Sequence, residues 1–320
     1  MTWNFPSEGR GHRFESCRVR HFLFAGCRRP TQPAFNSISK KLKEHRVKFI
    51  CRKSAAVQIT CIFTIAITLC SNSSATDAPT IASTSLCGDS YLQALAPNHI
   101  TALSWQSRSA LSRATNTQRK LPQLWDDPEV VLTSDADIIL FGSGEGRVSD
   151  ALDAQSIKLI WGEDFTTITT NAEAIKTTLN LQSDITKSWT HRIQALRDNA
   201  AHRKVTPKVL YLSRSGGSAG KNTFVDAAIT AAGGVNVVEN AGWFTPDPEH
   251  IISYKPDLII TSYFKNGYES VQSTAMRHKS VQRFIAKHPS VEIDGQLWPC
   301  AGPGLIDAAE LISEAIDKLP

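Results

Sequence analysis

Short apolar runs bounded by turn residues alternate with stretches of helical spacing over most of residues 80–320. This alternation predicts parallel β-strands joined by crossover helices, the α/β fold class. In the first half, strands are predicted over residues 80–86, 99–105, 136–142 and 157–162, and helices over 88–96, 128–134 and 148–155. In the second half, strands are predicted over 207–212, 256–261 and 290–295, and helices over 223–234, 247–254, 280–288 and 307–319.

The middle of the chain has helical periodicity and no strand signal. Ile185, Trp189, Ile193 and Leu196 fall on one face of a helix over about residues 183–203. A helix of that length is about 30 Å long and would act as a stiff spine. The pattern therefore predicts two α/β lobes joined by a single long helix: an N-terminal lobe over 76–166, a helical linker over 167–204 and a C-terminal lobe over 205–320.

The N-terminal segment differs in composition from the rest. Residues 1–75 hold 13 of the 35 Lys and Arg and 3 of the 30 Asp and Glu, so the remainder has a formal net charge of −5. A nucleic-acid-binding surface is therefore not expected in the main body. Residues 1–46 are basic and without hydrophobic periodicity. We expect that they are not part of the native protein; a disordered basic tail is the alternative.

Residues 47–75 have the layout of a secretory signal peptide. A basic start is followed by 16 residues without a charge and then by small polar residues. This order is typical of a leader that is cleaved, here after Ala75, and directs the protein to the periplasm. Attachment of a lipid to Cys70 is the alternative.

Cysteine usage agrees with export. Five of the seven cysteines lie within residues 1–75, which leaves Cys87 and Cys300 in the main body. An even pair in an exported protein suggests a disulfide. Two unrelated buried thiols are the alternative.

The segment SRSGGSAGKNTF, residues 213–224, follows a predicted strand and raises the question of nucleotide binding. The pattern G-x-x-x-x-G-K-[ST] requires glycine and a hydroxyl where this chain has Ser215 and Asn222. We therefore interpret the segment as a strand-to-helix turn. The sequence also contains no recognisably spaced catalytic triad and no clustered metal ligands, so an exported enzyme or a metal carrier is not favoured.

Two segments together resemble a known family. Residues 207–262 contain the glycine turn, AAGGVNVV and PEHIISYKPDLII in that order, and residues 136–163 contain ADIILFGSGEGRVSDALDAQSIKLIWGE. These segments resemble the two lobes of the helix-linked periplasmic substrate-binding proteins of ABC importers, which carry cobalamin, ferric siderophores or haem. The resemblance covers roughly residues 80–320. It implies a monomeric, non-enzymatic receptor without a cofactor, which delivers its ligand to an inner-membrane permease and its ATPase.

The cobalamin-carrying members show the greatest similarity, which implies a corrinoid ligand. Trp161 and Trp243 match ligand-contacting tryptophans, Phe141 lies near a third aromatic position, and Trp105 stands where a tyrosine would be. Such a ligand is expected in a cleft between the lobes, at the carboxyl ends of the strands. A ferric siderophore or haem is the alternative ligand, which Arg214 and Tyr263 would favour.

The glycine turn is expected to line the same cleft. Gly216 and Gly217 would let the backbone approach the ligand closely and would tolerate positive φ. Arg214 would pair with a carboxylate or phosphate, and its neighbour Ser213 lies at the strand end.

The resemblance also assigns residues outside the ligand site. In the family, one glutamate on each lobe pairs with arginines of the permease, and Glu145 and Glu249 match these positions. A subgroup with one cysteine in the first helix and one in the segment CAGP implies the pairing of Cys87 with Cys300.

Overall fold

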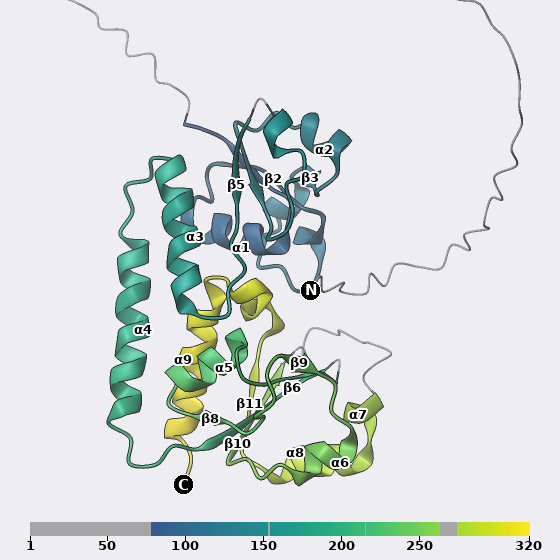
Figure 1. The fold of residues 1–320 in the computed structure, drawn as a ribbon, viewed down its shortest axis with the longest axis vertical. Helices are drawn as coiled ribbons and strands as arrows, with labels where there is room; N and C mark the ends of the chain where they lie inside the picture. The colour runs from purple at the N-terminus through teal and green to yellow at the C-terminus, as the bar shows by residue number, and fades with distance from the viewer. Residues whose placement is uncertain (1–77, 153, 215, 263–273) are drawn as a thin grey trace, which may run out of the picture. The chain divides into compact units, whose positions relative to one another are not determined.

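The computed structural model describes residues 78–152, 154–214, 216–262 and 274–320, all within one compact unit, Asn72–Pro320 (Figure 1). The predicted signal peptide and the residues before it lie outside the described residues, as do Ser215 and Tyr263. Within the described part the chain is α/β, with two separate parallel sheets.

The first sheet has five parallel strands in the order β3-β2-β1-β4-β5. The strands are β1 (Ile81–Ser83), β2 (Ile100–Ser104), β3 (Gln123–Leu124), β4 (Ile138–Phe141) and β5 (Gln155–Lys158). Its helical segments are α1 (Leu86–Leu95), η1 (Trp105–Arg108), η2 (Gln118–Lys120), α2 (Pro128–Leu132) and η3 (Ser149–Ala151). The short edge strand β3 was not predicted from the sequence.

The helix predicted over residues 148–155 is wrong. Only the single turn η3 forms there, without a side-chain cap at its start. Gln155 already pairs with Ile138 in the sheet, so the hydrogen bonds of the β-ladder replace those of a helix.

The second sheet has the order β11-β10-β6-β8 and is also parallel. Its strands are β6 (Lys208–Ser213), β8 (Val235–Asn236), β10 (Leu258–Ser262) and β11 (Ser290–Ile293), and a separate antiparallel pair is formed by β7 (Ser218–Ala219) and β9 (Trp243–Phe244). The helical segments are α5 (Phe224–Ala231), α6 (Pro248–Ser253), α7 (Thr274–Arg277), α8 (Lys279–Lys287), η4 (Gly295–Leu297), η5 (Pro299–Ala301) and α9 (Gly304–Asp317).

Two helices, α3 (Phe165–Thr178) and α4 (Ile185–Ala201), occupy the chain between the two sheets and lie side by side (Figure 1). Helix α4 corresponds to the predicted spine and, with 17 residues, is about 26 Å long. Trp189, Ile193 and Leu196 are buried, as the helical periodicity predicts. This face packs α4 against α3, α5 and α9.

Both faces of the second sheet are covered. In β6, Val209 and Tyr211 belong to one buried cluster, and the alternating Leu210 and Leu212 belong to another, with Ile251 of α6 and Val281 of α8. This alternation follows from the two-residue period of a strand. Because the faces are filled, the carboxyl ends of the strands are the natural place for a binding site.

Candidate ligand-binding site

Three exposed indoles lie at one edge of the first sheet. Trp105 follows β2, Trp125 follows β3 and Trp161 comes shortly after β5, and their exposed fractions are 55%, 42% and 47%. All five strands are parallel, so their carboxyl ends lie at the same edge. Trp105 and Trp125 follow the neighbouring strands β2 and β3, whereas Trp161 follows β5 on the other side of the sheet. Trp105 and Trp161 were predicted as ligand residues. Trp125 lies at the same carboxyl edge and was not predicted.

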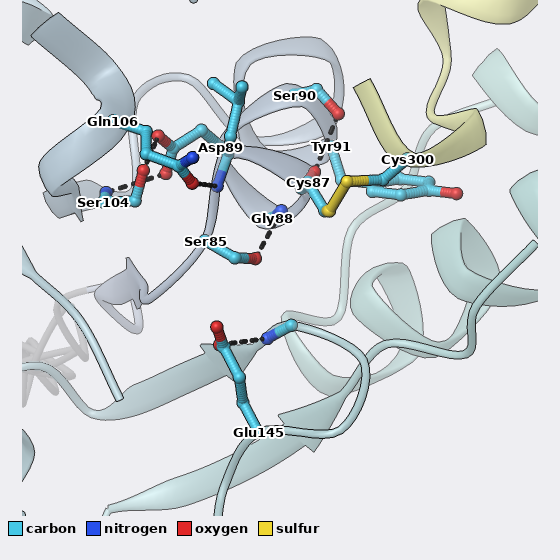
Figure 2. Close-up of a disulfide and its surroundings, with 12 residues drawn as sticks. Ser85, Cys87, Gly88, Asp89, Ser90, Tyr91, Ser104, Gln106, Glu145 and Cys300 are labelled. Atoms are coloured by element: carbon cyan, nitrogen blue, oxygen red, sulfur yellow. Dashed lines mark hydrogen bonds between the residues drawn. A yellow bond between two sulfur atoms is a disulfide. The ribbon is translucent and has the colours of Figure 1, made fainter. Parts of the chain in front are cut away.

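The backbone around Trp105 is fixed from three directions. The Asp89 carboxylate in α1 accepts hydrogen bonds from the Ser104 N–H at 2.9 Å and the Ser104 hydroxyl at 2.6 Å (Figure 2). On the other side, Gln106 Oε1 accepts a hydrogen bond from the Leu86 N–H at 3.3 Å. The Trp105 carbonyl itself accepts one from Gln123 Nε2 at 3.1 Å. An exposed side chain is thus carried on a fixed backbone.

Asp89 is a fully buried carboxyl group. Burial raises its pKa to about 6, while hydrogen bonds from Ser104 and Ser83 act in the opposite direction. Asp89 lies in the first turn of α1, where the positive end of the helix favours a negative charge. The group is therefore ionised at neutral pH.

The backbone before Trp161 is held in a similar way. Asn171 in α3 is buried; its Oδ1 accepts a hydrogen bond from the Ile160 N–H at 2.9 Å, and its Nδ2 donates one to the Ile160 carbonyl at 3.0 Å. The same Nδ2 lies 3.3 Å from the hydroxyl of Tyr91 in α1. Burial raises the pKa of Tyr91 to about 12, so its hydroxyl stays protonated.

The turn after β6 closes on itself. The Ser213 N–H donates to the Gly217 carbonyl, and the Gly217 N–H donates to Ser213 Oγ at 3.1 Å. Gly216 has a φ of +85°, a conformation that glycine adopts without strain. Arg214 is half-buried, and its N–H donates to the carbonyl of Ser262 at the end of β10. Ser213, Arg214, Gly216 and Gly217 therefore lie together at the carboxyl edge of the second sheet.

A different glycine of this segment has the strictest steric requirement. A Cβ built on Gly220 would lie 1.7 Å from the carbonyl oxygen of Asn240. The Gly220 N–H also donates to the Gly242 carbonyl. Gly220 thus brings the segment before α5 close to the strand that carries Trp243.

Trp243 is half-buried in a cluster of aromatic rings. Its ring centroid lies 6.3 Å from that of Tyr211 and 5.0 Å from that of Phe224. Trp298, which is 1% exposed, packs against the same two rings. Trp243 therefore offers a ligand only part of its indole, while Trp298 is a core residue.

Phe141 differs from its prediction. It is the last residue of β4, it has no exposed surface, and it packs in the cluster that contains Ala82, Ile139 and Val131. Alternation along β4 directs its ring into this core. We therefore leave Phe141 out of the ligand site.

The two glutamates matched to permease docking have different environments. Glu249 is exposed at the start of α6. Glu145 is half-buried, and its Oε2 accepts hydrogen bonds from the Gly142 N–H at 2.8 Å and the Thr84 hydroxyl at 2.5 Å. A carboxylate that closes the turn after β4 in this way is less available to a partner than that of Glu249.

The structure joins Cys87 of α1 to Cys300 of η5 by a disulfide, with 5.4 Å between the Cα atoms (Figure 2). Cys300 and Ala301 have φ of 56° and 50°, which is unusual for residues with a side chain. A Cβ on Gly302 would lie 2.6 Å from Ser90 Oγ. The segment before α9 thus packs tightly on α1.

Two surface hollows lie elsewhere. One, of about 290 Å³, is lined by α1 and the segment before α9, and the other, of about 580 Å³, by residues near the ends of α4 and α9. Neither is lined by a ligand residue predicted from the sequence. Among the described residues, no three His, Cys, Asp or Glu side chains gather to hold a metal ion, and no helix is long and apolar enough to span a membrane.

Comparison with known proteins identifies the fold. No protein-family model matches the chain. A cobalamin-binding protein of Halobacterium salinarum is 35% identical over 81 residues, which are 24% of this chain and 22% of that protein. The matched region is thus a small part of both proteins.

Solved structures extend the likeness to most of the chain. The periplasmic haem-binding protein of Vibrio cholerae has a TM-score of 0.60 at 18% identity, over 75% of this chain and 99% of that one. The periplasmic vitamin B12-binding protein of the same organism has a TM-score of 0.54 at 17% identity, over 75% and 97%. The chain therefore has the two-lobed α/β fold of these periplasmic binding proteins.

Proposed function

We propose that this chain is a periplasmic substrate-binding protein of an ABC importer, which binds a corrinoid and delivers it to an inner-membrane permease. The fold supports a binding protein, but a fold alone does not identify a ligand. The observation that carries the proposal is the set of exposed indoles Trp105, Trp125 and Trp161 at the carboxyl edge of the first sheet.

Indoles suit the chemistry of such a ligand. A corrinoid is large, and its ring presents apolar faces surrounded by polar amide groups. A tryptophan offers a rigid apolar face at low cost in conformational entropy and an N–H that can orient a polar group. Large exposed apolar patches on soluble proteins mark interaction surfaces or ligand-binding grooves.

The second lobe is proposed to complete the site. Trp243 keeps part of its indole accessible beside Tyr211 and Phe224. The turn of Ser213, Gly216 and Gly217 presents backbone with little side-chain bulk. We propose that the ligand lies between these groups and the first-lobe indoles, with α4 as the stiff linker between residues 76–166 and 205–320.

A haem or ferric siderophore is the second candidate ligand. The half-buried Arg214 at the end of β6 favours it, because a guanidinium pairs well with a propionate or another carboxylate. Both candidates would occupy the proposed site between the two sheets, and they differ in whether Arg214 or the indoles contribute most to affinity.

Calorimetry on the protein recovered from the periplasm separates the candidates. Cyanocobalamin, haem and a ferric siderophore are titrated in parallel, and N-terminal sequencing of the same sample locates the cleavage site expected after Ala75. Saturable binding of cyanocobalamin supports the corrinoid proposal. Binding of haem or the siderophore alone would replace it with the second candidate, and binding of none of the three would contradict both.

A further inference from the structure

The residue directly before each of two exposed indoles is held by a buried polar side chain. Ser104 precedes Trp105 and gives both its N–H and its hydroxyl to Asp89. Ile160 precedes Trp161; its N–H donates a hydrogen bond to Asn171 Oδ1, and its carbonyl accepts one from Asn171 Nδ2. In each case the holding side chain comes from a helix, α1 or α3, and makes two hydrogen bonds to one residue.

Neither polar group is needed to fill the core. Asp89 is 0% exposed and Asn171 is 4% exposed, and burying a carboxylate or an amide costs free energy unless it is hydrogen-bonded. An apolar residue of similar size would avoid this cost. Two backbone groups at a strand end would then lose their partners and the local chain direction would be less defined.

We propose that Asp89 and Asn171 are positioning residues, which fix the directions in which Trp105 and Trp161 present their indoles to the ligand. The inference rests on the proposed function, because it assigns these indoles to the ligand site. It adds that affinity depends on two buried groups that do not touch the ligand.

The two holding groups are themselves connected. Asp89 and Tyr91 both belong to α1, and the Tyr91 hydroxyl is the third contact of Asn171. Helix α1 therefore contributes to the orientation of both Trp105 and Trp161. The holding contacts are nevertheless separate, so each can be removed without touching the other.

Fluorine NMR of protein labelled with 5-fluorotryptophan tests the positioning without any ligand. Each resonance is assigned by replacing one tryptophan with phenylalanine. Asp89→Ala is expected to shift or broaden the Trp105 signal and to leave Trp161 in place, and Asn171→Ala the reverse. Asn236→Ala removes a buried amide of the second lobe that is 5% exposed, and it is expected to move neither signal. Equal changes of both signals in every variant would overturn the proposal.

Double-mutant cycles then test the effect on binding, using cyanocobalamin as the probe. Asp89→Ala is expected to weaken binding about tenfold in the parent and about twofold or less once Trp105 is alanine, while keeping its full effect when Trp161 is alanine. Asn171→Ala should likewise weaken binding about tenfold in the parent and about twofold or less once Trp161 is alanine, while keeping its full effect when Trp105 is alanine. Equal losses in all backgrounds would show a general structural effect and would contradict the proposal.

A conservative variant separates geometry from loss of folding. Asp89→Asn keeps an acceptor for the Ser104 N–H and offers an N–H to its hydroxyl, so it should restore both the Trp105 signal and the affinity. If Asp89→Ala does not fold, Ser104→Ala removes one of the two contacts and is expected to give a smaller change in the same signal. An unchanged Trp105 signal in Ser104→Ala, or a failure of Asp89→Asn to restore it, would contradict the role of Asp89. If the NMR pattern holds but the probe does not bind, the positioning stands and the proposed function fails.

Discussion

Arg192 on α4 reaches Glu310 on α9 with two parallel hydrogen bonds, from Nε to Oε1 at 2.7 Å and from Nη2 to Oε2 at 2.5 Å. Its Nη2 also lies 2.7 Å from an oxygen of Asp307, and the other oxygen of Asp307 accepts from Arg113 of the first lobe at 3.2 Å. The pKa of Arg192 is raised, chiefly by its hydrogen bond to Glu310. The network thus joins α4, α9 and a first-lobe loop at one point.

Removal of this arginine should destabilise the protein moderately. Arg192 and Glu310 are 34% and 36% exposed, so solvent screens the pair, and Arg192→Met is expected to lower the free energy of unfolding by about 1 kcal/mol. The loss should shrink in high salt. Urea unfolding at two salt concentrations measures both effects. Lys187→Met is the control, because Lys187 and Asp184 are 77% and 84% exposed and no change is expected. Equal losses in both variants would contradict a special role for the α4–α9 contact.

The titration of Asp89 should be visible in the pH dependence of stability. Its pKa rises from an ordinary value of 3.8 to about 6 on folding. The folded state therefore binds the proton more tightly, and the stability gained is complete below pH 3.8 and is lost as the pH rises through 6. Two pKa units correspond to about 3 kcal/mol.

Asp89→Asn removes this contribution. We expect the variant to show a smaller fall in unfolding free energy between pH 4 and 7 than the parent, measured by urea unfolding at each pH. Asp137→Asn is the control, because the pKa of Asp137 shifts in the opposite direction on folding. The hydrogen bonds from Thr80 lower the pKa of Asp137, so its contribution is present above the unfolded pKa and is lost as the pH falls through the folded pKa. Identical pH profiles of Asp89→Asn and the parent would contradict the raised pKa of Asp89.

Loss of the disulfide should lower stability strongly. Cys87 and Cys300 are separated by 213 residues, and the chain-entropy model gives a contribution of about 5 kcal/mol for so long a loop. The variant Cys87→Ala/Cys300→Ala is expected to melt at a lower temperature and to be insensitive to reductant, whereas reductant should lower the melting temperature of the parent. Mass spectrometry without reduction should recover the joined peptides. Free thiols at both positions in the exported protein would refute the pairing.

The indoles should separate into ligand contacts and core residues. Trp105→Ala, Trp125→Ala and Trp161→Ala are each expected to weaken ligand binding about tenfold or more with little change in stability, because the side chains are exposed. Trp298→Ala should instead cost about 3–5 kcal/mol of stability, because its ring is buried. Calorimetry and urea unfolding of each variant measure the two quantities. Unchanged affinity in all three exposed variants would refute the proposed site.

Glu249 should matter for delivery rather than for binding. Its carboxylate is exposed at the start of α6, so Glu249→Arg is expected to leave ligand affinity unchanged and to reduce stimulation of the permease ATPase in proteoliposomes. Glu239→Arg, another exposed glutamate of the second lobe, is the matched control. Equal stimulation by the parent and Glu249→Arg would exclude this docking role.

The sequence predicts most of the fold because its strands are strongly patterned. β4, β6 and β10 are nearly continuous apolar runs, as expected for strands covered on both faces. β3 has only two residues, Gln123 and Leu124, and offers too short a pattern. Trp125 was missed for this reason, since a strand end cannot be located when the strand itself is not predicted.

Side-chain direction limited the prediction of the site. Trp161 was assigned to the ligand site by the family resemblance, and the structure places it beyond the end of β5 with an exposed side chain. Phe141 belongs to β4 itself, and its neighbour Leu140 faces the opposite cluster, so Phe141 is directed into the core. The contacts of Asp89 and Asn171 join residues in different elements, and no local pattern in one sequence reveals them.

The position of the two cysteines has a consequence for biogenesis. Cys300 lies 213 residues after Cys87, so the ribosome makes the partner of Cys87 only after it has made both parallel sheets and helices α1 to α8. A chain that is cut short or stalls before residue 300 therefore carries Cys87 without its disulfide partner. Labelling with a thiol reagent would distinguish such a truncated chain from one in which the disulfide has formed.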